Sequence, residues 1–88
     1  MNKKELFNNL KENMQKEFES SGTTYTIIIA ARPPYKFQNH YTKTIGHADN
    51  YSDGMKIIKK LENKYGDILK ENNFYVASYY TPKRYKNY

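Results

Sequence analysis

The chain has 88 residues, which is the length of one small domain, and its formal net charge is +6. It contains no cysteine, which excludes disulfide bonds, thiolate metal sites and cysteine nucleophiles, while its ten tyrosines and four phenylalanines predict a folded domain with a thin core. The longest apolar run, residues 27–31, is too short to span a membrane, and no apolar segment follows the first lysines as it would in a signal peptide.

Residues 2–19 are predicted to form an amphipathic helix. Asn2 and Glu5 fit the capping-box pattern at its start, and residues 20–22, Ser-Ser-Gly, provide its end. The apolar residues recur at intervals of three or four, which places them on one side of a helix. This stripe consists of Leu6, Phe7, Leu10, Met14 and Phe18.

Residues 23–32 form the most strand-like segment of the chain. The segment is β-branched or aromatic through residues 24–29 and apolar toward both sides, which is typical of a central strand. Pro33 and Pro34 end it, because neither can donate a hydrogen bond to a sheet. After a connection, residues 40–47 have the polar and charged character of an edge strand.

A second helix is predicted to begin in the polar cluster at residues 49–53. Its apolar stripe runs to Ile68, and Gly66 within the stripe marks a break or kink, because glycine disfavours a helix by about 1 kcal/mol relative to alanine. Asn72 and Asn73 can take the left-handed conformation that ends helices. Residues 74–81 form a third strand, which Pro82 closes. The remaining residues, 83–88, form a basic, tyrosine-rich tail.

These elements predict an α+β fold with the order α-β-β-α-β. The first two strands form a hairpin, and the third joins the other side of the first, which gives a three-stranded antiparallel sheet of order 2-1-3. Because each helix has one apolar stripe, both helices cover the same face of the sheet. Residues 1–82 constitute a single domain, and the opposite face is left for solvent or for a partner.

No motif predicts catalysis, a metal site or a cofactor. The segment at residues 49–54 begins like a calcium loop, but Tyr51 and Lys60 occupy two ligand positions of that pattern, so a helix start explains it better. His40 and His47 lie on opposite faces of a regular strand and cannot share one metal ion. We therefore expect a protein that is not an enzyme and that holds neither metal nor cofactor.

The excess of positive over negative charge is confined to two segments, residues 23–48 and 74–88, which contain no acidic residue. Eight of the ten tyrosines lie in the same segments. Strands disfavour Asp and Glu, which is one explanation. The other is a binding surface, since cations neutralise phosphates and tyrosines stack on bases, although tyrosines also anchor protein interfaces. The candidate binding residues are Arg32, Tyr35, Lys36, Tyr41, Lys43, Tyr79, Lys83, Arg84, Tyr85 and Lys86.

Arg32, Tyr35 and Lys36 flank the two prolines and are the sharpest candidates. Pro33 and Pro34 restrict the backbone, and a rigid segment loses less entropy on binding. A planar guanidinium such as that of Arg32 can stack on a base or clamp a phosphate or a carboxylate. The other explanation for these residues is a solvated hairpin end.

In its general character the chain resembles the small accessory proteins of phages and mobile elements, among them the anti-CRISPR proteins. It is short and free of cysteine, and its richness in Asn, Lys and Tyr indicates an AT-rich genome. The resemblance implies action in the cytoplasm of a bacterial host cell. We expect a non-enzymatic module that engages nucleic acid or a nucleoprotein, or alternatively an inhibitor that contacts a host defence nuclease. A homodimer formed through the open sheet face is a further possibility.

Overall fold

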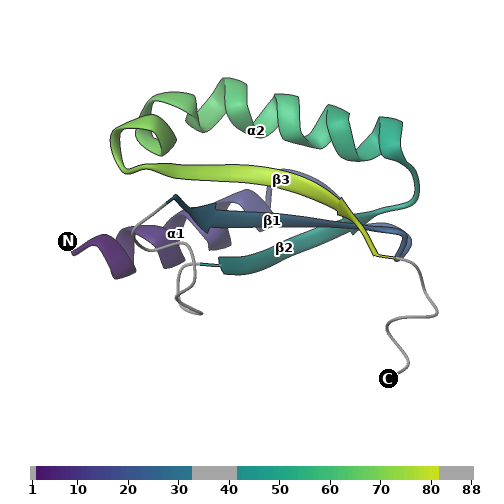
Figure 1. Cartoon of the computed structure of the whole chain (residues 1–88), viewed down its shortest axis with the longest axis horizontal. Coiled ribbons are helices and arrows are strands. Elements are labelled where there is room, and N and C mark those ends of the chain that lie inside the picture. Colours follow the sequence, from purple (N-terminus) through teal and green to yellow (C-terminus); the bar gives the residue numbers. More distant parts are fainter. Residues whose placement is uncertain (1, 33–41, 82–88) are drawn as a thin grey trace.

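The computed structural model describes residues 2–32 and 42–81, which form two helices and three strands (Figure 1). In chain order these elements are α1 (Lys3–Gln15), β1 (Tyr25–Ala31), β2 (Thr42–Ala48), α2 (Tyr51–Glu71) and β3 (Phe74–Tyr80). The predicted order α-β-β-α-β and the α+β class are confirmed.

The sheet is antiparallel with the strand order β2-β1-β3, as the sequence predicts. β1 pairs with β2 on one side and with β3 on the other, so the apolar strand is the central one. Its pairing with β3 is regular from Tyr25 opposite Tyr80 to Ala31 opposite Phe74. Its pairing with β2 shifts register between Ile27 and Ile28, as at a β-bulge.

Both helices pack on one face of this sheet. Ile27, Ile29 and Ala31 alternate along β1 and are buried, and they belong to a single cluster with apolar residues of both helices. The cluster includes Phe7, Leu10 and Met14 from α1 and Ile58, Leu61 and Leu69 from α2. α1 lies behind β1 and β2, while α2 runs along β3 (Figure 1). The prediction that the helices share a face is therefore correct.

Helix α1 begins as predicted and ends four residues early. The backbone N–H of Glu5 donates to Oδ1 of Asn2 at 2.8 Å, which caps the first turn. The helix ends at Gln15, whereas the stripe predicts a helix to residue 19. The chain leaves the helix because Phe18 packs against Gly46 of β2, where an added Cβ would lie 2.6 Å from the phenyl ring. The tertiary contact thus outweighs the helical pattern.

Glu17 ties the segment after α1 to helix α2. Its carboxylate pairs with the Lys64 ammonium and accepts a hydrogen bond from the Tyr65 hydroxyl at 3.3 Å. The hydrogen bond from Lys64 lowers the pKa of Glu17, and in return the pKa of Lys64 is raised. The carboxylate is consequently charged when the domain is folded at neutral pH, and it fixes the exit from α1.

Helix α2 has both of the predicted ends. The backbone N–H of Asp53 donates to Oδ1 of Asn50 at 2.9 Å, so the segment that resembles a calcium loop is a helix cap. Asn73 ends the connection to β3 with a φ of 58°, in the left-handed region. The predicted break at Gly66 is wrong, because α2 is one continuous helix from Tyr51 to Glu71.

Gly54 of α2 provides the space into which Ser78 of β3 projects. A Cβ on Gly54 would lie 2.6 Å from Oγ of Ser78 and 3.8 Å from Cδ1 of Ile27. The hydroxyl of Ser78 is buried and has no hydrogen-bond partner among the described residues. An unsatisfied buried hydroxyl costs roughly 1–3 kcal/mol, so this close approach of helix and strand carries a local penalty.

We expect Gly54→Ala and Ser78→Ala to be strongly coupled. In the Ser78→Ala background the nearest side-chain atom to the new methyl group is at ordinary contact distance, and alanine favours the helix by about 1 kcal/mol. In the wild-type background the methyl group meets Oγ of Ser78. Urea denaturation of the four proteins should give a coupling energy of about 1 kcal/mol or more. Effects that add to within roughly 0.5 kcal/mol would contradict this packing.

Candidate binding surface

The sheet face that does not carry the helices is the candidate site, here called the open face. Because side chains alternate along a strand, residues that pair with Thr26, Ile28 and Ala30 share this face. On β3 they are Tyr75, Ala77 and Tyr79, and on β2 they are Thr42, Thr44 and His47. The open face thus combines small and β-branched residues with two tyrosines and a histidine.

The sheet carries no carboxylate. None of the nine acidic residues of the chain lies in a strand that the structure describes; all lie in the helices or their adjoining segments. The described strands lie in the two acid-free segments of the sequence, so the absence of carboxylates is confined to the sheet layer of the molecule. An anionic ligand on the open face would meet no repulsive side chain from the strands.

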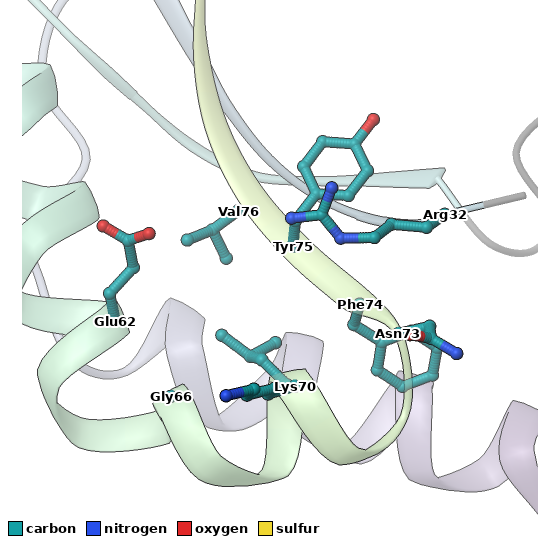
Figure 2. Close-up of a pocket in the computed structure, with 9 residues that line it drawn as sticks. Arg32, Glu62, Gly66, Lys70, Asn73, Phe74, Tyr75 and Val76 are labelled. Carbon is teal, nitrogen blue, oxygen red and sulfur yellow. The ribbon is translucent and has the colours of Figure 1, made fainter.

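Arg32 and Tyr75 form a stacked pair at one end of the open face. The guanidinium carbon of Arg32 lies 5.1 Å from the centroid of the Tyr75 ring, and Figure 2 shows the two groups together. The backbone N–H of Arg32 donates to the carbonyl oxygen of Asn73 at 2.8 Å, which extends the β1–β3 pairing by one residue. The Arg32 side chain is exposed, and these two contacts hold it beside the Tyr75 ring.

Tyr79 provides a second aromatic ring on the same strand and the same face. Its side chain is 49% exposed. Tyr75 and Tyr79 are four residues apart, which corresponds to about 13 Å at the rise of a β-strand. The open face consequently presents aromatic groups at two separate positions along β3, with Arg32 beside the first.

Lys43 does not join this surface. It pairs with Ile29, whose side chain is buried under the helices, so Lys43 lies on the helix-covered side of β2 and is half-buried. The sequence contains the signal for this placement, because Lys43 precedes the buried Ile45 by two residues. Tyr75, in contrast, shares the face of Tyr79 and was omitted from the residues selected by sequence.

Of the residues selected by sequence, the structure places Arg32 and Tyr79 on the open face, at separate positions along the sheet. The rest of that selection, Lys43 apart, lies outside the described residues: Tyr35, Lys36, Tyr41, Lys83, Arg84, Tyr85 and Lys86. Their placement stays a prediction from the sequence.

A groove borders the Arg32–Tyr75 pair along the outer edge of β3. It has a volume of about 230 Å³ and lies between β3 and the C-terminal half of α2 (Figure 2). Glu62, Gly66 and Lys70 line it from the helix, and Val76 lines it from the strand. Charged side chains therefore line both walls of the groove, Arg32 on one and Glu62 with Lys70 on the other.

The described residues contain no group of three or more histidine, aspartate or glutamate side chains that could hold a metal ion. Among the described residues, the pKa values that shift are those of Glu17, Lys64 and Tyr65, in the contact between α2 and the segment that follows α1. The arrangement on the open face can stack against a planar ligand group and neutralise a negative charge.

Comparison of the chain with protein-family models, curated proteins and solved structures finds no match. Within residues 2–32 and 42–81, neither helix has the length and apolar character needed to cross a membrane. The residues and the charge of the open face are therefore the available indications of function.

We expect Arg32 to contribute little to stability. A cation–π contact between exposed groups is worth about 0.5–1 kcal/mol, and the backbone hydrogen bond to Asn73 does not need the side chain. Arg32→Ala should lower the free energy of unfolding, measured with urea, by about 1 kcal/mol or less. Ile29→Ala, on the buried side of the same strand, should lower it by roughly 2–5 kcal/mol. A comparable loss in both variants would show that Arg32 is structural.

Proposed function

We propose that this protein is a non-enzymatic module that binds single-stranded nucleic acid on the open face of its sheet. In the same proposal it acts as a phage or mobile-element protein on nucleic acid or on a nucleoprotein. The observation that supports it is a carboxylate-free sheet face on which Arg32 is stacked on Tyr75, with Tyr79 exposed on the same strand.

The chemistry of this face suits an unpaired strand. Aromatic faces stack on bases, and each stacked base is worth roughly 1–3 kcal/mol. The guanidinium of Arg32 can bind a phosphate while its plane remains against Tyr75. A base pair inside a duplex hides the faces of its bases, so two separate aromatic rings on a sheet face favour single strands over double strands.

The charge of the chain fits the same ligand. The net charge is +6, and the two acid-free segments account for all of it. Cations that neutralise phosphates release counterions, so binding should weaken as salt concentration rises. The acidic residues lie in the helical layer and in the connections, and Glu62 among them lines the groove beside Arg32 and Tyr75.

Fluorescence anisotropy with labelled oligonucleotides tests this proposal. Single-stranded thymidine oligomers should bind at low salt, more tightly than a duplex, with an affinity that falls linearly in a double-logarithmic plot against salt. Tyr75→Ala and Tyr79→Ala should each weaken binding by about 5- to 150-fold, as the loss of one stacked base implies. Tyr51→Ala is the matched control, because Tyr51 is 62% exposed but lies on α2, and it should bind like the wild type.

Absence of binding at low salt, or equal weakening by Tyr51→Ala, would contradict the proposal. The alternative, an inhibitor that contacts a host defence nuclease, predicts a different result. In a pull-down from a bacterial lysate, its protein partner would remain bound after nuclease treatment, and free oligonucleotides would bind weakly.

A further inference from the structure

The groove between β3 and the C-terminal half of α2 has an apolar floor. Leu69, Phe74 and Val76 line it, and all three are buried members of the core cluster. The volume of about 230 Å³ is smaller than the roughly 300–1,000 Å³ of pockets for drug-sized ligands. The groove therefore suits one planar ring system that carries a small charged group.

Gly66 keeps the helix wall of this groove open. It lies within the continuous helix α2, where glycine is less favourable than alanine, and a Cβ there would meet no atom of the described residues within 4 Å. Packing among the described residues therefore does not require a glycine at this position. A ligand in the groove gives the missing side chain a role, because a larger residue would project into the space that Gly66 lines.

The charged residues of the groove are separated along it. Figure 2 shows Arg32 at one end, beside Tyr75, and Glu62 at the other, with Val76 and Lys70 between them. Arg32 can clamp a phosphate with its planar guanidinium, and Lys70 adds a second cation on the helix wall. An ionised carboxylate such as that of Glu62 only accepts hydrogen bonds, so it favours a ligand group with N–H donors at that end.

Arg32 and Tyr75 connect the groove to the open face. Both residues line the groove, and both belong to the stacked pair on the open face. A strand that stacks on Tyr79 and Tyr75 consequently reaches the entrance of the groove. Its phosphate can remain at Arg32 while the next base turns around the edge of β3.

We propose that the groove holds one guanine nucleotide of the strand that is bound on the open face. The base lies over the apolar floor, with a phosphate at Arg32 and the Watson–Crick edge of the base at Glu62. Guanine presents two adjacent N–H donors on this edge, N1–H and the N2 amino group, which match the two oxygens of a carboxylate. The other bases present a single donor group beside acceptors. This inference rests on the proposed function, because the strand on the open face delivers the nucleotide.

Fluorescence anisotropy with short labelled oligomers tests the assignment. Thymidine oligomers that carry a single guanosine, at either end or in the middle, should include one that binds at least about fivefold more tightly than the all-thymidine oligomer, as one bidentate base contact implies. A single adenosine at the same place should give no such gain. Adenine stacks as a purine but lacks the two adjacent donors, so it separates recognition by Glu62 from stacking.

Glu62→Gln tests the role of the carboxylate. The variant should reduce the preference for guanosine to about twofold or less, because the charge-assisted pair of hydrogen bonds is lost. Glu12→Gln is the matched control, since it removes the same charge from an exposed position on α1. It should keep the preference of the wild type, and an equal loss in both variants would overturn the assignment.

Gly66→Leu tests the groove itself. Leucine favours a helix and its side chain would fill the groove, so the variant should melt roughly 3–6 °C above the wild type and yet lose the guanosine preference. Asn63→Leu, at an exposed position of the same helix outside the groove, should keep the preference. Retained preference in Gly66→Leu would overturn the proposal. If this variant fails to fold, Glu62→Gln decides the question.

The oligomer measurements separate this inference from the proposed function. Binding of the all-thymidine oligomer with no gain from guanosine would overturn the groove assignment and leave the open-face proposal standing. An equal gain from guanosine and adenosine would also overturn the assignment, since stacking alone would explain it. If the all-thymidine oligomer does not bind at low salt, the open-face proposal fails and this inference fails with it.

Discussion

The two-sided pairing of β1 is the constraint on which the rest of this structure depends. β1 is the only described strand with a neighbour on each side, and Ile27 and Ile29 bury their side chains completely beneath both helices. Burial of such side chains is worth about 1.5–3 kcal/mol each, which matters greatly in a domain of this size. The core lies on one side of a single sheet. The other face and the two outer edges therefore lie outside the core, where polar, charged or aromatic side chains can be placed.

The surfaces outside the core differ in their side chains and in the contacts at their edges. Acidic residues are confined to the helical layer and the connections, and the open face carries tyrosines and Arg32 instead. Ser20 and Ser21 form hydrogen bonds with His47 on the β2 edge, whereas a groove lies between the outer edge of β3 and α2.

The order of elements and the layer arrangement could be predicted from the sequence, because periodicity and caps are local signals. The end of α1 could not, since it depends on Phe18 meeting Gly46 and on Glu17 meeting Lys64, contacts between residues distant in sequence. The continuity of α2 through Gly66 likewise depends on packing elsewhere along the helix. For the site, the acid-free, tyrosine-rich character of residues 74–88 selects Tyr79, while alternation along β2 separates Lys43 from it. The stack of Arg32 on Tyr75 joins two strands and needed the register of the sheet.

The central claim is that the open face, and not the helical layer, is where this protein meets its ligand. The most direct measurement is a two-dimensional NMR titration of ¹⁵N-labelled protein with a short thymidine oligomer, at constant protein concentration. The account predicts that the largest changes in amide chemical shift occur at Arg32, Tyr75 and Tyr79 and in the neighbouring residues of β1. Changes concentrated on the exposed side of α2, for example at Lys56, or no changes at low salt, would contradict it.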